Sequence, residues 1–217
     1  VNGEIYNFSR LRKELQENYT FQSHSDSEVI LHGFEEWGIE GLLERIEGMY
    51  ALAIFQKNTK TLYLARDRAG IKPLYFSING DSLLWSSELT PIEYFRQFGS
   101  SDVDPESIQD FLTYRYIPAP KTLYKNTFKL EASHYLKVDA DRMAIQTKRY
   151  WQPELEDSNS SESRTILETK EILERSVSQQ LVSDAPIGTF LSGGIDSSLI
   201  TAIAANSHSN IKTYSIG

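Results

Sequence analysis

The stretch FLSGGIDSSLITAI, residues 190–203, places two glycines, an aspartate and three serines between two apolar runs. Residues 187–192 have the uninterrupted apolar character of a buried parallel strand, and residues 197–207 are typical of a helix. The glycines therefore fall in a strand-to-helix turn, where backbone N–H groups and the helix dipole favour an anion. Because glycine has no Cβ, phosphate oxygens can approach this backbone closely. We interpret the turn as a phosphate-binding loop.

The side chains of this turn support the same interpretation. Ser192, Ser197 and Ser198 supply hydroxyl donors, and Asp196 is suited to hold Mg²⁺ against phosphates. The loop has no lysine, which excludes the Walker A pattern, and it does not match the dinucleotide-binding pattern. A glycine-rich turn with an aspartate cap remains the alternative, although a strand at 211–217 would complete a β-α-β unit and favours the phosphate loop.

A second group of chemically informative residues lies near the amino terminus. NGEIYN, residues 2–7, taken alone predicts only a strand end and an Asn-Gly turn. Five further motifs follow in one order: SDSEVIL (25–31), EGMYALAIF (47–55), ARDRAGIKPLYF (65–76), SSEL (86–89) and SDAPIGTFLSGGIDSS (183–198).

Together these motifs resemble glutamine-hydrolysing asparagine synthetase over essentially the whole chain, and SGGIDSS resembles the pyrophosphate loop (PP-loop) of ATP pyrophosphatases. The resemblance implies a combined α+β and α/β fold. Its first part would be a truncated α-β-β-α glutaminase sandwich of the Ntn type, a class II glutamine amidotransferase domain. Its second part would be the start of a parallel-sheet PP-loop ATP pyrophosphatase domain.

The resemblance also implies roles for individual residues. Asn2 and the Gly3 N–H would form an oxyanion hole, a role that needs preorganised donors. Glu4 and Asp26, with Asn2 and Gly3, would bind glutamine, and Asp26 would pair with its ammonium group. Asp196 would contact the metal. The ATP-binding residues would be Leu191, Ser192, Gly193, Gly194, Asp196, Ser197 and Ser198.

The implied reaction is the ATP-dependent amidation of aspartate to asparagine. The aspartate side chain would attack the α phosphorus of ATP, giving β-aspartyl-AMP and pyrophosphate, and ammonia from glutamine would then displace AMP. ATP and Mg²⁺ are the implied cofactors, and glutamine, aspartate and ATP are the substrates. Members of this family often dimerise through the glutaminase domain, so the resemblance allows a homodimer.

Two alternatives remain open. FLTYRYIPAPKTLYK, residues 111–125, recurs in relatives that act on other carboxylates in polysaccharide and natural-product pathways. The other alternative is a non-catalytic remnant that binds a nucleotide or a partner.

Composition narrows the class of partner. The net charge of −8 and the pI of about 5.1 indicate neither nucleic acid nor an anionic membrane surface as a partner. No run of 18 apolar residues and no signal-peptide pattern occur. With zero cysteines the chain has no disulfide framework and no cysteine zinc site. These features favour a cytoplasmic protein with small-molecule ligands.

The lack of cysteine departs from the family pattern. Class II amidotransferases use an N-terminal cysteine as nucleophile, and Val1 offers no hydroxyl or thiol in its place. The chain also stops one strand after the glycine loop. We therefore expect an internal fragment that by itself performs neither half-reaction.

The elements that must position these residues can be read from the pattern. The first ninety residues carry short strands around one or two helices, whereas the last fifty alternate helix and strand, so two domains are predicted, at 1–100 and 101–217. Ser25 or Asp26 would cap a helix through Ile30, Phe34 and Trp37, with a second short helix at 42–46. Hairpins are expected at 49–56 with 61–67, and around Asn79-Gly80-Asp81.

Further along, Asp104 before Pro105 predicts a helix start, and Pro118 and Pro120 predict its end. The serine-rich residues 156–163 are expected to be flexible and to precede a helix with one apolar face, formed by Ile166, Leu173, Val177 and Leu181. Arg66 and Arg68 are expected to brace the structure rather than to contact substrate.

Overall fold

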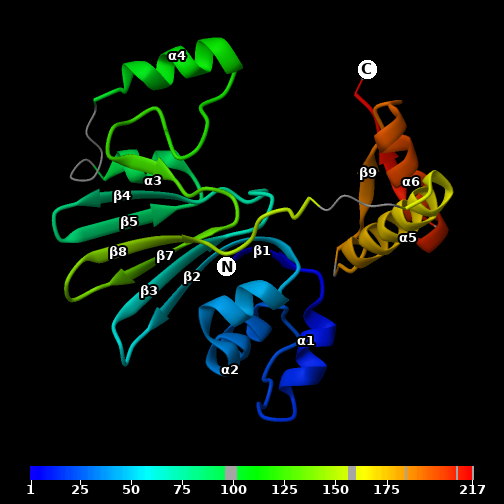
Figure 1. Cartoon of the computed structure of the whole chain (residues 1–217), viewed down its shortest axis with the longest axis horizontal. Coiled ribbons are helices and arrows are strands. Elements are labelled where there is room, and N and C mark those ends of the chain that lie inside the picture. Colours follow the sequence, from blue (N-terminus) through cyan, green and yellow to red (C-terminus); the bar gives the residue numbers. More distant parts are fainter. Residues whose placement is uncertain (96–101, 156–159, 184, 209, 217) are drawn as a thin grey trace. The chain divides into compact units, whose positions relative to one another are not determined.

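A computed structural model describes residues 1–95, 102–155, 160–183, 185–208 and 210–216. The chain divides into two compact units, Val1–Pro153 and Glu154–Gly217, and each is treated by itself (Figure 1). The helices and strands of the first unit are β1 (Asn2–Ile5), α1 (Phe8–Leu15), α2 (Ser27–Arg45), β2 (Gly48–Gln56), β3 (Thr61–Arg66), β4 (Tyr75–Asn79), β5 (Ser82–Ser86), α3 (Leu89–Tyr94), α4 (Pro105–Tyr114), β6 (Thr127–Lys129), β7 (His134–Asp139) and β8 (Ala144–Arg149).

The strands of the first unit form two antiparallel sheets. The larger sheet has the order β1-β2-β3-β7-β8, and the smaller has the order β5-β4-β6. Both predicted hairpins are confirmed, because β2 pairs with β3 and β4 pairs with β5 in antiparallel register. The helix start predicted at Asp104 is also confirmed, since its carboxylate accepts the N–H of Glu106 at 3.3 Å and α4 begins at Pro105.

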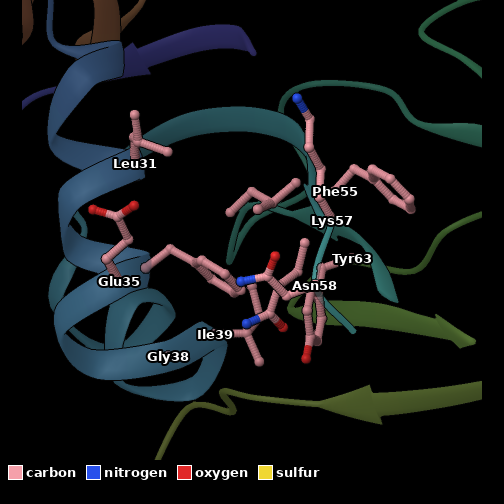
Figure 2. Close-up of a pocket in the computed structure, with 11 residues that line it drawn as sticks. Leu31, Glu35, Gly38, Ile39, Phe55, Lys57, Asn58 and Tyr63 are labelled. Carbon is pink, nitrogen blue, oxygen red and sulfur yellow. The ribbon is translucent and has the colours of Figure 1, made fainter. Parts of the chain in front are cut away.

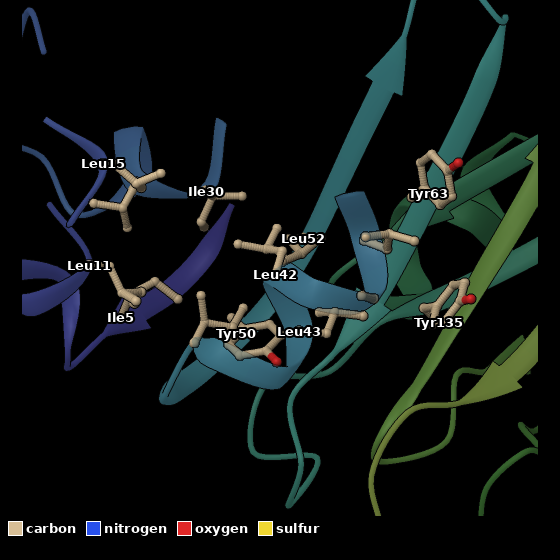
Figure 3. Packing of buried hydrophobic residues seen from close by; sticks show 14 residues of the cluster. Ile5, Leu11, Leu15, Ile30, Leu42, Leu43, Tyr50, Leu52, Tyr63 and Tyr135 are labelled. Carbon is tan, nitrogen blue, oxygen red and sulfur yellow. The ribbon is translucent and has the colours of Figure 1, made fainter. Parts of the chain in front are cut away.

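The central strand β3 shows how these layers pack. Tyr63 and Ala65 belong to a core cluster that includes residues of α1 and α2, whereas Leu62 and Leu64 belong to a second cluster with Leu74 and other residues of the sheets. Alternate side chains of β3 therefore face two different cores, which explains why the whole strand is buried. Figure 3 shows the first cluster, with side chains from the helices against those of the large sheet.

This arrangement confirms the expected fold class. Helices α1 and α2 cover one face of the large sheet, and the small sheet lies against its other face (Figure 1). The short helix α3 packs on the small sheet through Ile92, which is buried. The layers are therefore α, β, β and a short α, as in the truncated glutaminase sandwich that the sequence predicted.

The first compact unit extends beyond residue 100, where the sequence favoured a boundary. Strand β7 pairs with β3, and β6 pairs with β4, so residues after 126 complete both sheets of the first unit. The division between compact units lies at Pro153 and Glu154 instead. Strands β7 and β6 are too distant in sequence from their partners β3 and β4 for local patterns to reveal the pairing.

Helix α2 contains the break that the sequence predicted. Gly38 has φ 67° and ψ −176°, a non-helical conformation that separates two helical halves within Ser27–Arg45. Glycine is suited to this φ because it carries no Cβ. Asp26 precedes the helix but its side chain makes no capping hydrogen bond. Ser25 Oγ instead accepts the N–H of Ser27 at 3.1 Å.

The second unit contains a short parallel β-α-β arrangement. Its elements are α5 (Glu162–Gln180), β9 (Gly188–Phe190), α6 (Ile195–Ser207) and β10 (Lys212–Tyr214). Strands β9 and β10 pair in parallel, as expected for the α/β part of the fold. The predicted helix after the serine-rich segment is α5, although residues 156–159 of that segment lie outside the described residues.

One expectation about this unit was wrong. The apolar run at 187–192 predicted a buried strand, but Phe190 is 78% exposed. Within the described residues β9 has one neighbouring strand, β10, so its apolar side chains are incompletely covered. On α5 and α6 the apolar residues Ile166, Leu173, Leu199 and Ile203 line an open groove of about 350 Å³. Among the described helices of both units, none has the length and apolar character needed to cross a membrane.

Candidate functional site

Gly3 lies in β1 at a position that no other residue could fill without rearrangement. Its φ is +148°, and a Cβ built on it would lie 1.9 Å from the Met49 carbonyl oxygen. The strand pairs with β2 so that Gly3 stands opposite Tyr50. Close approach of two backbones therefore explains this glycine, and its N–H is placed by a fixed strand rather than by a loop.

Asp26 is joined directly to the same strand. Its Oδ2 accepts the backbone N–H of Ile5 at 2.8 Å. N–H groups alternate in direction along a strand, so the N–H of Gly3, two residues earlier, points to the same edge as that of Ile5. Asn2 and Gly3, predicted from one motif, and Asp26, predicted from another, are thus brought to the same strand. The exposed Glu4 lies between Gly3 and Ile5 on β1.

The Asn2 side chain contacts the second sheet. Its Nδ2 donates to Ser87 Oγ at 3.0 Å, across 85 residues of sequence. Ser87 directly follows β5, the edge strand of the small sheet. The sequence singled out the SSEL motif but assigned Ser87 no role. The hydrogen bond could not be foreseen because it joins two separate sheets.

The loop before Asp26 is organised by Glu28. The Glu28 carboxylate accepts the N–H groups of Gln22 and Ser23 at 2.7 and 2.8 Å and the Ser23 hydroxyl at 2.6 Å. These hydrogen bonds, the Ser23 hydroxyl first, lower the pKa of Glu28 from 4.5 to about 2. The His32 ring lies one helical turn further on, with Nε2 3.5 Å from Glu28 Oε1. An ionised Glu28 therefore holds the segment that presents Asp26.

Asp67 is a buried carboxylate held by backbone N–H groups. Its Oδ1 accepts from Ala69 at 3.1 Å and Ile71 at 2.9 Å, and its Oδ2 accepts from Lys72 at 2.9 Å and Tyr50 at 3.2 Å. The residue is 1% exposed. Four N–H donors satisfy a buried anion without a paired cation. The carboxylate fixes the loop after β3 and also holds Tyr50, the residue opposite Gly3.

Arg66 and Arg68 brace the first unit through carbonyl oxygens. Arg66 donates to the carbonyls of Lys72, Leu130 and Gly70 at 2.8, 2.7 and 2.6 Å. Burial lowers the pKa of Arg66 from its ordinary value. Arg68 donates to a carbonyl of α2 at 2.9 Å. Both arginines therefore brace the first unit by donating to backbone carbonyls.

Two tyrosines connect β2 to the end of the first unit. The hydroxyls of Tyr50 and Tyr150 lie 2.9 Å apart, and Tyr150 donates to the Arg66 carbonyl at 2.8 Å. Burial raises the pKa of Tyr50 and raises that of Tyr150 to about 12. Both hydroxyls therefore stay protonated at neutral pH and act as structural donors behind the β1 edge.

The glycine loop of the second unit forms the predicted strand-to-helix turn. Gly193 has φ +81° with open space where a Cβ would lie, and Gly194 precedes α6 in extended conformation. Ser192 and Ser197 hydroxyls lie 3.0 Å apart, and Ser197 Oγ accepts the Ser192 N–H at 3.3 Å. These bonds close the loop into a compact turn at the start of α6, the geometry that suits an anion.

Asp196 and Ser198 lie in the first turn of α6, and Leu191 leads into the loop. The Leu191 N–H donates to the Tyr214 carbonyl at 2.8 Å, and its carbonyl accepts the Ser215 hydroxyl at 2.7 Å. In the described parts of the chain, no group of three or more acidic or imidazole side chains could hold a metal by itself. A single carboxylate such as that of Asp196 is a suitable partial ligand for Mg²⁺, which takes its other oxygens from water and substrate phosphates.

A separate pocket of about 540 Å³ lies between α2 and the β2–β3 hairpin (Figure 2). Its walls include Leu31 and Phe34 from α2 and Phe55 and Tyr63 from the hairpin. None of the residues that the sequence predicted as functional lines it. Strand β1 pairs with β2 only as far as Ala51, whereas the pocket is lined by the last residues of β2, 54–56. The pocket therefore lies at the other end of β2 from the pairing with β1.

Comparison with known families identifies this architecture. Residues 1–151 match the family described as glutamine amidotransferase domain. The chain belongs to the glutamine amidotransferase domain family. Residues 168–217 match a second family, described as asparagine synthase. The first match contains the β1 edge and Asp26, and the second contains the glycine loop.

Several curated proteins resemble this chain. It is 35% identical over 217 residues to asparagine synthetase (glutamine-hydrolyzing) 1 of Bacillus subtilis (strain 168), covering 100% of this chain and 34% of that protein. It is 36% identical to asparagine synthetase (glutamine-hydrolyzing) 3 of the same organism, covering 99% and 36%. The chain thus spans about a third of the length of the curated relatives it matches.

More distant similarities were also found. The chain is 28% identical to amidase chry2 of Gibberella zeae, covering 95% of this chain and 30% of that protein. Among solved structures, glutamine phosphoribosylpyrophosphate amidotransferase of B. subtilis aligns with a TM-score of 0.49 and 17% identity, covering 98% of this chain and 44% of the other.

Proposed function

We propose that this chain forms the glutamine-binding and ATP-binding parts of an enzyme that amidates aspartate to asparagine. One observation carries the proposal: a single chain holds both an edge strand that contains Asn2 and Gly3 and is hydrogen-bonded to Asp26, and a glycine loop at the start of α6. The full-length relatives at 35% and 36% identity are named as glutamine-hydrolysing asparagine synthetases. That name supports the same pairing of activities here.

At the β1 edge, the glutamine side-chain amide would place its oxygen toward the Gly3 N–H and the Asn2 amide. Attack on the amide carbon turns this oxygen into an oxyanion, which the two donors would stabilise. The Asp26 carboxylate would bind the substrate ammonium, with Glu4 beside it. The chain has no cysteine, so the thiol that the family uses is not among these residues. The chain alone is therefore expected to bind glutamine without hydrolysing it.

At the glycine loop, residues from Leu191 to Ser198 would hold the nucleotide phosphates. The aspartate carboxylate would attack the α phosphorus, forming the β-aspartyl-AMP anhydride as pyrophosphate leaves, and ammonia would then displace AMP. Asp196 would contact Mg²⁺, which lowers the charge on the phosphates during this attack. A cytoplasmic location and dimerisation remain predictions.

A second candidate is amide formation on a different carboxylate. The similarity to a protein named as an amidase, at 28% identity, supports this second candidate. The residues described here belong to the nitrogen-donor and nucleotide sites, and neither group selects the acceptor.

The test is an assay of the full gene product that contains this chain. It would be incubated with glutamine, aspartate, ATP and Mg²⁺, and AMP, pyrophosphate and asparagine would be measured together. Equal amounts of AMP and asparagine support aspartate amidation. AMP that forms only with another carboxylate supports the second candidate. Absence of nucleotide turnover with every acceptor would leave a nucleotide-binding remnant and reject both.

A further inference from the structure

We propose that Ser87 is a positioning residue that orients the Asn2 amide in the oxyanion hole. The inference rests on the proposed glutaminase function of the β1 edge and adds a residue to that site. The observation behind it is the hydrogen bond of 3.0 Å from Asn2 Nδ2 to Ser87 Oγ.

The chemistry of the amide group explains what this bond does. The Asn2 Nδ2 carries two N–H groups, and Ser87 accepts one of them. The amide is planar, so a bond to one N–H fixes the direction of the other. An oxyanion is stabilised most by a donor that is already oriented before the charge develops. Ser87 thus leaves one Asn2 N–H available and sets where it points.

The position of Ser87 suits this role because the serine is itself fixed. It follows β5, which pairs with β4 in the small sheet, and it precedes α3. The neighbouring Ser86 Oγ accepts the Glu88 N–H at 3.1 Å and holds the turn between strand and helix. Asn2 instead belongs to the large sheet. The bond therefore ties the Asn2 side chain to the second sheet of the first unit.

Asn2 has few other restraints on its side chain. It is exposed at the end of an edge strand that pairs with β2 alone among the described strands. Without Ser87 the Asn2 side chain would sample several rotamers, and only some of them direct Nδ2 toward the substrate. A solvent-exposed neutral hydrogen bond contributes little to folding, so its removal should change orientation more than stability.

The experiment measures kcat and KM for glutamine hydrolysis in the full gene product, comparing the unmodified protein with S87A, S87T, S86A, N2A and the double variant N2A/S87A. S87A is expected to lower kcat by about tenfold, a part of the loss seen when an oxyanion donor is removed, with KM for glutamine nearly unchanged. S87T keeps the hydroxyl and should restore kcat. S86A is the control for the turn, because it removes a neighbouring hydroxyl that holds the turn but does not contact Asn2.

The double variant separates positioning from a structural role. If Ser87 acts through Asn2, S87A lowers kcat no further once Asn2 is already alanine. An S87A loss that persists unchanged in the N2A background, or that S86A reproduces, would overturn the inference. So would an S87A enzyme with normal kcat while the unmodified protein hydrolyses glutamine. An unmodified protein without glutaminase activity would instead reject the proposed function, and with it this inference.

Discussion

Asp26 accepts the backbone N–H of Ile5 at 2.8 Å, which joins the loop before α2 to the edge of β1. The other carboxylate oxygen lies 3.4 Å from the hydroxyls of Ser25 and Ser27. Oδ2 therefore fixes the carboxylate against β1, and Oδ1 has the longer contacts of the two. This relationship allows the structural and the ligand-binding contributions of Asp26 to be separated.

Asp26→Asn should raise KM for glutamine by roughly ten- to a hundredfold, the equivalent of one hydrogen bond to a charged group. Asparagine keeps an oxygen that can accept the Ile5 N–H, so the strand edge should remain in place. The measurement is glutaminase kinetics of the full gene product. Asp26→Ala is the companion variant, since it removes both the charge and the acceptor. Equal KM values for Asp26→Asn and the unmodified protein would argue against an ammonium partner at this position.

Gly3→Ala should destabilise the first compact unit. A Cβ would lie 1.9 Å from the Met49 carbonyl oxygen, and the φ of +148° is unfavourable for alanine. Gly80→Ala is the matched control, because Gly80 has φ +57° but nothing within 4 Å of a Cβ. The control should cost about 1 kcal/mol from conformation alone, and Gly3→Ala should cost clearly more.

Tryptophan fluorescence during urea unfolding would measure both glycine variants. Trp37, Trp85 and Trp151 all lie in the first compact unit, so the signal reports on that unit. If the two variants lose the same stability, the contact between β1 and β2 near Gly3 is not tight in solution.

Protonation of Glu28 should make the first unit less stable at low pH. Its pKa in the folded protein is lowered from 4.5 to about 2, so the ionised form favours folding. The contribution is complete above the ordinary pKa and is lost as pH falls through the window from 4.5 to about 2. The stability difference between the unmodified chain and Glu28→Gln should therefore shrink across this window.

Thermal unfolding followed by tryptophan fluorescence, repeated from pH 6 downward, measures that difference. Glu14→Gln, on the exposed face of α1, serves as a control for the loss of one surface carboxylate. A difference between the unmodified chain and Glu28→Gln that stays constant over the acid range would contradict the hydrogen-bonded, ionised state of Glu28.

Asp196→Ala should abolish ATP-dependent synthesis in the full gene product and leave glutamine hydrolysis intact. The residue lies in the first turn of α6 in the second compact unit, whereas the β1 edge lies in the first. Measuring AMP formation and glutamate formation in the same sample provides an internal control. Retained synthesis would remove Asp196 from the proposed Mg²⁺ contact.

Local sequence patterns predicted the hairpins, the break in α2, the start of α4 and the turn before α6. Each of these depends on residues close together in the chain, such as Asp104 and Pro105 or Gly193 and Gly194. The strands β6, β7 and β8 were not predicted. The partners of β6 and β7, which are β4 and β3, lie about fifty to seventy residues earlier, and alternating polarity does not specify a distant partner. Strand β8 pairs with β7, so its place in the sheet depends on that distant pairing.

In the candidate site, too, local motifs could be predicted from the sequence but contacts between distant residues could not. Asn2, Gly3 and Asp26 were found through their motifs, but the contacts that hold them come from residues without an evident signal. Ser87 reads as one serine among several, and Asp67 reads as a surface charge within ARDRAG although it is 1% exposed. Their partners are backbone groups or side chains from distant elements, which a sequence pattern does not display.

The pairing of β3 with β7 also affects how the protein is made. During synthesis β3 leaves the ribosome with β2 as a neighbour, but its other edge stays open until the chain has passed residue 139. The hydroxyl contact between Tyr50 and Tyr150 forms later still. Contacts of such long sequence separation slow folding, and open strand edges invite aggregation. A shortened protein that ends at residue 100 would leave the edges of β3 and β4 open permanently, so we expect it to aggregate more than a version that ends at residue 153.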